Sequence, residues 1–182
     1  MEGGLDLPPP RKEGDFAVIR VKAVLPQEWP LWRALRLQAL EDAPYAFGSR
    51  LSEWQGDGDA EWRWRDRLQS VAFNAVAEVR GTPAGMVSGA DGGGEAPKEA
   101  ELLSLWVAPW ARGQGVGDAL VETVLAWAAS RARDMVSLSV REQNRPAIAL
   151  YRRHGFVDVG PDGGEESPEL RERRMVRSLH DG

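Results

Sequence analysis

A glycine-rich turn carries the strongest chemical signal in this sequence of 182 residues. Its residues are Arg112-Gly113-Gln114-Gly115-Val116-Gly117-Asp118, between an apolar run typical of a buried strand and a segment with helical periodicity. Glycines at such a place let the backbone approach a ligand, and the N–H groups that open the helix point toward it. Arg112 adds a fork of hydrogen-bond donors. We therefore expect the turn to hold a pyrophosphate group.

Two common phosphate-binding motifs do not fit this turn. A P-loop requires Gly-Lys-Ser/Thr at the start of the helix, whereas Asp118 and Ala119 follow Gly117 here. The dinucleotide fingerprint needs a third glycine three residues after its second, where this sequence has Asp118 or Leu120. A tight turn without any ligand would use the same glycines, so the turn alone does not separate the two interpretations.

A second motif, NRPAIALYRRHGF, occupies residues 144–156. It resembles the signature Asn-x-x-Ala-x-x-Leu-Tyr-x-x-x-Gly-Phe of the GNAT N-acetyltransferase superfamily. Arg112, Gly115 and Gly117 fit the superfamily's other motif, Arg/Gln-x-x-Gly-x-Gly/Ala, at the usual separation. The resemblance extends from about Phe16 to Leu179, and the stretch from Leu35 to Gly48 is similar to one bacterial group of the superfamily.

This resemblance implies a fold and a reaction. The fold is of the α/β (α+β) class, with a central mixed, mostly antiparallel sheet, a splayed parallel strand pair, and flanking helices. The reaction moves an acetyl group from acetyl-CoA, the co-substrate, to a primary amine by direct attack in a ternary complex. The implied CoA-binding residues are Leu105, Trp106, Val107, Arg112, Gly113, Gln114, Gly115, Val116, Gly117, Asp118, Asn144 and Tyr151.

Tyr151 is the candidate general acid. Asn144 and Tyr151 are about two helical turns apart, so both can lie on one helix face. In the superfamily the matching tyrosine lies near the thioester sulfur, and the matching asparagine contacts the pantetheine arm. A leaving thiolate benefits from a proton, since a comparable thiol has a pKa of about 8.5. The alternatives are a half-buried tyrosine with a satisfied hydroxyl and an asparagine that only caps the helix.

Glu101 is the candidate general base, at a position where some relatives carry a catalytic glutamate. Strand alternation predicts that it shares a face with Leu103 and Leu105, whose apolar side chains would raise its pKa. A solvated carboxylate at a strand end is an equal alternative. Glu53, Asp57 and a chain of water molecules also remain open as the base.

Aromatic residues in the first third of the chain are candidates for the wall of the acceptor site. The spacing of Trp32 indicates core packing. Trp54, Tyr45 and Phe47 lie between two predicted helices, where aromatic faces would suit a cationic amine, although core packing is the commoner use. A small-molecule amine and a peptide or protein N-terminus both remain open as acceptors.

Composition excludes several other classes of function. Without cysteine the chain has no disulfide, no thiolate metal ligand and no cysteine nucleophile. His154, expected at the surface, and His180, in the tail, are the only histidines, and we expect no metal site. The net charge of −5 argues against nucleic acid as a partner and mildly favours cationic substrates. No apolar run suits a membrane span and the N-terminus lacks a signal peptide, so we expect no membrane partner and a cytoplasmic location.

The pattern of elements predicts how these residues are positioned. We expect a flexible leader over residues 1–14 and a single domain over 15–182. Asp57 or Asp59 should cap the second helix, and Gly81-Thr82-Pro83 should turn a hairpin. The runs 101–107 and 135–140 should pair in parallel across the third helix. The remaining predicted strands are 16–22, 71–80, 84–90, 156–159 and 173–179, and the other helices end near residues 42, 68 and 153.

The rival to an enzyme is a non-catalytic acyl-CoA-binding regulatory module. Such a module would keep the turn from Arg112 to Gly117 but would tolerate the loss of Tyr151. The presence of both Asn144 and Tyr151 favours the enzyme. A homodimer is left open by the sequence.

Overall fold

The structure, a computed structural model, describes residues 18–93, 98–162 and 171–180. The predicted leader over residues 1–14 lies outside this part of the chain. One seven-stranded sheet has the order β1-β2-β3-β4-β5-β7-β6, and its neighbours are antiparallel except for the parallel pair β4 and β5. The strands are β1 Ile19–Ala23, β2 Phe73–Val79, β3 Thr82–Asp91, β4 Glu99–Val107, β5 Met135–Arg141, β6 Val157–Asp162 and β7 Glu172–Ser178.

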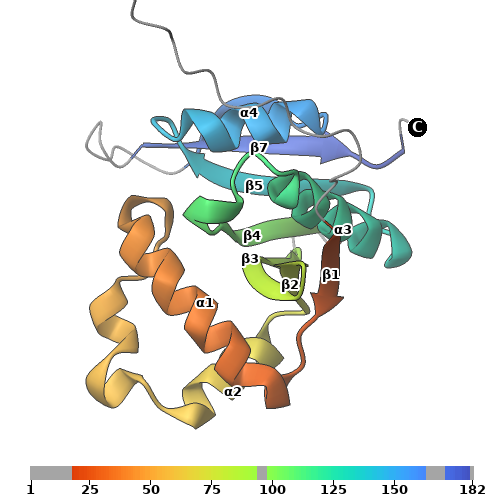
Figure 1. The fold of residues 1–182 in the computed structure, drawn as a ribbon. Helices are drawn as coiled ribbons and strands as arrows, with labels where there is room; N and C mark the ends of the chain where they lie inside the picture. The colour runs from red at the N-terminus through yellow and green to blue at the C-terminus, as the bar shows by residue number, and fades with distance from the viewer. Residues whose placement is uncertain (1–17, 94–97, 163–170, 181–182) are drawn as a thin grey trace, which may run out of the picture.

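Helices cover both faces of this sheet (Figure 1). Helices α1 (Trp29–Asp42) and α2 (Glu61–Ser70) pack on one face, whereas α3 (Val116–Ser130) and α4 (Arg145–Arg153) pack on the other. Alternate residues of β2 divide between the two cores, because Val76 packs with α1 while Ala75 and Ala77 pack with α3. The mixed, mostly antiparallel sheet with flanking helices confirms the predicted fold class.

Two local predictions are wrong. Ala60, rather than Asp57 or Asp59, is the N-cap of α2, and its side chain makes no capping hydrogen bond. Asp59 instead accepts a hydrogen bond from Trp64 Nε1 at 2.9 Å and forms an ion pair with Arg33. The hairpin between β2 and β3 turns at Arg80-Gly81, whose φ angles of 52° and 81° form the tight left-handed turn that suits a twisted hairpin.

A bulge at Ser104 divides β4 into two halves. Ser104 has a φ of 55°, and the register with β3 shifts by one residue between Ser88↔Leu103 and Met86↔Trp106. Leu102 therefore packs in the core beneath α3, whereas Trp106 packs in the core beneath α1.

The bulge overturns the expectation that Glu101 and Leu105 share a face of the strand. Glu101 alternates with Ala100 and Leu102, which both lie in the α3 core. Leu105 packs against that same core, because the extra residue has reversed the alternation. Glu101 thus projects from the sheet face opposite to Leu105.

Strands β4 and β5 separate soon after they pair. Of the nine residues in β4, three pair with β5, from Glu99↔Met135 to Glu101↔Ser137. The rest of β4 diverges from β5, and α4 follows β5 at the open end. This opening is the predicted splay, and it positions the site. Within the described ranges, no helix is long and apolar enough to cross a membrane.

Candidate active site

A hollow of about 450 Å³ lies at the open end of β4, between the glycine-rich turn and α4. It is built from the last residues of β4, the turn, the first residues of α4 and the segment after α1. The predicted CoA-binding residues among its lining are Leu105, Trp106, Val107, Arg112, Gly113, Gly115, Gly117, Asp118 and Asn144. Three predicted contacts do not line this hollow. Gln114 Nε2 donates to the Trp110 carbonyl at 2.8 Å, Val116 is buried in the core, and Tyr151 lines a neighbouring hollow.

The geometry of the turn fits a pyrophosphate group. Gly115 is the N-cap of α3 with a φ of 89°, and Gly113 has a φ of 73°, so both occupy a left-handed region that favours glycine. A Cβ on Gly117 would lie 3.0 Å from Leu150 Cδ2 and would crowd the floor of the turn. The first N–H groups of α3 have no partner within the helix, and the helix dipole makes this end positive.

Two ion pairs flank the turn. Arg112 forms an ion pair with Asp42 at the end of α1, and its Nε donates to the Val107 carbonyl at 3.1 Å. Asp118 accepts hydrogen bonds from Arg153 and His154, each at 2.9 Å. Burial alone would raise the pKa of Asp118, but the hydrogen bonds and positive charges of Arg153 and His154 together outweigh burial and lower it. The His154 side chain is 11% exposed, so this residue is more buried than the predicted surface position implies.

A second hollow, also about 450 Å³, adjoins the first. The two share Ala46, Phe47, Leu105, Asn144 and Ala147 in their linings, so they meet where β4 and β5 diverge. Tyr151 and Glu101 both line the second hollow. The structure thus brings the candidate acid and the candidate base to one cavity, beside the pocket of the glycine-rich turn.

Tyr151 is 6% exposed, and its ring packs edge-on against Phe156 with the centroids 5.8 Å apart. Burial raises the pKa of its hydroxyl above the ordinary value of a tyrosine, which keeps the group protonated at neutral pH. Within the described part of the chain, no residue forms a hydrogen bond with this hydroxyl. The proton of Tyr151 is therefore available to a molecule in the cavity. Asn144 caps α4, because its side-chain oxygen accepts from the Ala147 N–H at 3.3 Å.

Glu101 is half-buried, and none of the described residues forms a hydrogen bond or ion pair with its carboxylate. Burial raises its pKa, and the nearby charges of Asp162 and Glu99 raise it further against the opposing effect of Arg174. The alternative bases Glu53 and Asp57 are exposed and line neither hollow.

The predicted aromatic wall is present only in part. Phe47 lines both hollows and Tyr45 lines the first. Trp54 lines neither, because its ring packs against Trp64 with the centroids 4.4 Å apart and the residue is 8% exposed. The expectation that Trp54 lines the acceptor site is therefore wrong, while Trp32, 1% exposed, confirms its predicted core position.

The model of the acetyltransferase (GNAT) family matches residues 32–156 of this chain. The chain belongs to the GNAT family. It is 37% identical over 105 residues to an uncharacterized N-acetyltransferase of Methanocaldococcus jannaschii, covering 54% of this chain and 46% of that protein. It is 36% identical over 140 residues to the mycothiol acetyltransferase of Acidothermus cellulolyticus, covering 72% and 42%. The GNAT chain thus spans less than half the length of these curated relatives.

Solved structures share the GNAT fold with this chain. A GNAT-family acetyltransferase from Streptococcus pneumoniae aligns with a TM-score of 0.70 at 21% identity, covering 88% of this chain and 98% of that one. The yncA protein of Salmonella typhimurium, solved with its cofactor acetyl-CoA, aligns with a TM-score of 0.71 at 19% identity, covering 90% and 95%. These alignments support the predicted fold.

Sequence reasoning missed two arginines in this GNAT chain. Arg36 on α1 and Arg67 on α2 line the second hollow, and Arg36 is 7% exposed. The sequence does contain a sign that Arg36 is buried. Arg36 lies four residues from both Trp32 and Leu40, so it falls on the apolar face of α1 that packs in the core.

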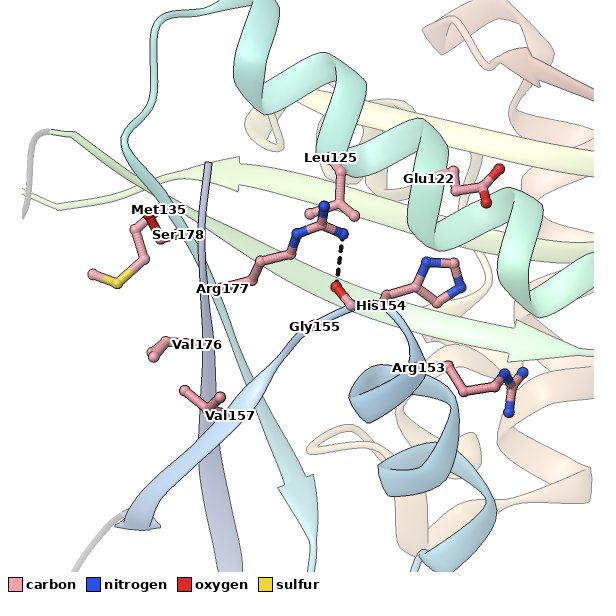
Figure 2. A pocket seen from close by; sticks show the side chains of 10 residues that line it. All are labelled: Glu122, Leu125, Met135, Arg153, His154, Gly155, Val157, Val176, Arg177 and Ser178. Atoms are coloured by element: carbon pink, nitrogen blue, oxygen red, sulfur yellow. Dashed lines mark hydrogen bonds between the residues drawn. The ribbon is translucent and has the colours of Figure 1, made fainter. Parts of the chain in front are cut away.

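A larger hollow, about 820 Å³, lies away from this chemistry, between the end of α4 and strands β6 and β7 (Figure 2). Arg177 Nη1 donates to the His154 carbonyl there at 2.6 Å and ties β7 to the end of α4. None of the predicted catalytic or CoA-binding residues lines it, so we assign it no part in the reaction.

Proposed function

We propose that this chain transfers an acetyl group from acetyl-CoA to a primary amine. The observation that carries the proposal is the meeting of the two hollows at the splayed end of β4. One hollow has the glycine turn at its rim, and the other holds Tyr151 and Glu101. When bound, acetyl-CoA would supply the activated acetyl thioester.

The glycine-rich turn and β4 would hold the CoA moiety. The N–H groups at the start of α3 and the Arg112 guanidinium would bind the pyrophosphate. The backbone of Leu105, Trp106 and Val107 has no pairing with β5 and would hydrogen-bond the pantetheine arm. A backbone N–H on this stretch would also stabilise the oxyanion that develops during acetyl transfer. Asn144 would contact the arm from the start of α4 while it caps the helix.

Glu101 and Tyr151 would move the protons of the reaction. Glu101 would take a proton from the acceptor ammonium, directly or through one water molecule, so that a neutral amine attacks the acetyl carbonyl carbon. As the carbon–sulfur bond breaks, Tyr151 would donate its hydroxyl proton to the leaving sulfur. The attacking nitrogen would lose its surplus proton through water, and a proton from water would restore the Tyr151 hydroxyl. The raised pKa of Glu101 suits a base that works near neutral pH, and the raised pKa of Tyr151 suits an acid that starts protonated.

Two measurements test this proposal together. Calorimetric titration with CoA should show binding, and the Gly117→Glu variant should abolish it while circular dichroism shows an intact fold. Gly93→Glu, at an exposed position with open space around it, is the matched control and should bind CoA as the unmodified chain does.

Transfer itself is measured by thiol release from acetyl-CoA with a panel of amines and N-terminal peptides. Turnover of any amine supports the enzyme. CoA binding without turnover of any amine would instead identify a non-catalytic acyl-CoA-binding module. Undiminished CoA binding by Gly117→Glu would remove the turn from the site.

A further inference from the structure

Arg36 and Arg67 place two positive charges at one end of the second hollow. Arg36 comes from α1 and Arg67 from α2, and both donate to Ser104 Oγ, at 3.5 Å and 3.4 Å. Ser104 is the bulged residue of β4, so the same irregularity that redirects the strand also presents this hydroxyl to the two guanidinium groups. All three residues line the hollow.

Among the described residues, neither guanidinium has an acidic partner. Arg67 donates to Asn74 Oδ1 at 3.4 Å and to Ser88 Oγ at 3.3 Å, and the Arg36 guanidinium also lies 4.5 Å from the Phe47 ring centre. These partners are neutral, so the positive charges of both arginines are left without a counter-charge in this part of the chain. A guanidinium carries five N–H donors, and a buried charge is costly without a counter-charge.

The electrostatics of the pair agree with this geometry. Burial, and then the positive charge of Arg67, lower the pKa of Arg36 to about 10, which still leaves it charged at neutral pH. Burial also lowers the pKa of Arg67. An anion between the two groups would supply the missing negative charge. The Ser104 oxygen accepts from both guanidinium groups, and no described residue accepts its hydrogen, which can therefore be donated to the same anion.

Two glutamates also line the hollow. Glu101 lines it without an ion-pair partner among the described residues, whereas Glu172 is paired with Arg141 at 3.3 Å. Glu101 and Ser104 are three residues apart on one strand, which corresponds to about 10 Å. Leu105, where the two hollows meet, directly follows Ser104. One small molecule would therefore place its anion at Ser104 and its amine on the side of Ser104 that faces Glu101, in the hollow that meets the first hollow at Leu105.

Resting on the proposed function, we infer that the acceptor is a small amino acid-type molecule, with a carboxylate a few bonds from the amine that is acetylated. Arg36, Arg67 and Ser104 hold the carboxylate, and Glu101 faces the ammonium. A peptide N-terminus has an amide where a free amino acid has its carboxylate, so it would leave both arginines without a counter-charge. The net charge of −5 mildly favours cationic substrates, whereas this inference gives the acceptor a carboxylate beside its ammonium.

Paired acceptors test this inference. Each L-α-amino acid is compared with its own α-amide, which keeps the side chain and the amine but removes the carboxylate charge. Rates of thiol release are compared at equal concentrations of free amine, because the carboxylate also changes the basicity of the amine. We expect at least one amino acid to exceed its amide in kcat/KM on the order of 10²-fold, since buried donors reject an analogue without the matching group.

Variants assign the effect to the arginines. Arg36→Gln and Arg67→Gln should each lower kcat/KM for the amino acid on the order of 10-fold or more, chiefly through KM, while they change the rate of its amide little. Arg65→Gln is the matched control on α2, because Arg65 pairs with Glu61 outside the hollow. A readout without turnover is the rise in Tm when the amino acid is added to the CoA-bound protein, which should be lost in both arginine variants and kept in the control.

The outcomes separate this inference from the proposed function. Transfer to amines without a carboxylate as fast as to amino acids, or transfer confined to peptides, would overturn the inference and leave the acetyltransferase standing. The inference also fails if no amino acid is acetylated while another amine is. Absence of both CoA binding and transfer would overturn the proposed function, and the inference with it.

Discussion

The Arg112 guanidinium forms an ion pair with the Asp42 carboxylate, which ties the glycine-rich turn to the end of α1, 70 residues earlier in the chain. The same carboxylate oxygen accepts a hydrogen bond from Trp106 Nε1 at 2.9 Å. The arginine proposed to bind pyrophosphate is therefore positioned by an acid that also partly neutralises it. Phosphate and carboxylate would compete for one guanidinium.

We expect Asp42→Asn to tighten CoA binding by about 2- to 5-fold, because an exposed ion pair is worth little and its loss frees Arg112 for phosphate. The asparagine oxygen can still accept from Trp106, so the fold should be kept. Arg112→Gln should weaken CoA binding by roughly 10-fold or more, since it removes a charged donor. Calorimetric titration measures both. If Asp42→Asn weakens binding as much as Arg112→Gln does, Asp42 is needed to shape the turn.

Asn144 should have two separable roles. Asn144→Ala removes the cap of α4 and should lower the free energy of unfolding by about 1 kcal/mol. Asn144→Asp keeps an oxygen that can cap the helix, so stability should change little. Both variants lack the amide N–H groups and should lose CoA affinity alike. Chemical denaturation and CoA titration check the two roles independently, and full CoA affinity in both variants would leave Asn144 as a cap alone.

Tyr151→Phe keeps the ring and its contact with Phe156 but removes the hydroxyl. We expect kcat to fall on the order of 10²- to 10⁴-fold with little change in CoA affinity, because a general acid acts in the transition state. Stability should hold, since none of the described residues bonds to the hydroxyl. Single-turnover kinetics provide the measurement. An unchanged rate of the chemical step would exclude Tyr151 as the acid.

Glu101→Gln should alter the pH dependence of the reaction. The base must be ionised to act, and its pKa is raised by burial, so activity should rise with pH through that raised value. The variant should lose most activity near neutral pH and regain part of it at high pH, where the free amine needs no base. A kcat/KM profile that superimposes on that of the unmodified chain would show that Glu101 is only a strand-end carboxylate.

Glu99 and Glu101 should affect stability in opposite directions. The pKa of Glu101 is raised, so the folded state binds more protons and stability falls as pH rises from the unfolded-state pKa to the folded-state pKa. For Glu99, burial would raise the pKa, but Ser137 and Arg174 outweigh burial and lower it. Its stabilisation is present above the unfolded-state pKa and is lost as pH falls through the lower folded-state value.

The two glutamates therefore serve as controls for each other. At pH 7, Glu101→Gln should raise the free energy of unfolding and Glu99→Gln should lower it, and both differences should shrink in acid. Urea denaturation at several pH values measures them. A fall in stability for both variants at pH 7 would contradict the raised pKa of Glu101.

Most of the secondary-structure elements could be predicted from the sequence for a physical reason, whereas the CoA-binding residues remain a prediction. Glycines in a turn, an N-cap and apolar periodicity are local properties, so Gly115, Asn144 and the helix α4 could be recognised from neighbouring residues. Arg36 and Arg67 could not be paired in this way. They come from two helices and meet only at Ser104, a contact between residues far apart in sequence.

The bulge explains a second failure of prediction. The alternation of side chains between the two faces of a strand assumes that each residue opposes one residue of the neighbouring strand. The extra residue of β4 near Ser104 breaks this pairing with β3 and reverses the alternation halfway along β4. Nothing in the run ELLSLWV marks this position. The face on which Glu101 lies could therefore be determined only from the pairing of β4 with β3.

The short pairing between β4 and β5 divides the backbone hydrogen bonding of this sheet into two halves that are joined at one end. The strands β1 to β4 form one half and β5, β7 and β6 form the other, linked by the pairs from Glu99↔Met135 to Glu101↔Ser137. Backbone amides beyond Glu101 on the open side should exchange their hydrogens with solvent faster than those in the paired strands. A ligand that hydrogen-bonds this stretch would take the place of the missing strand. Binding would then couple the two halves of the sheet. The backbone amide hydrogens of both halves should exchange with solvent more slowly in the bound protein than in the free protein.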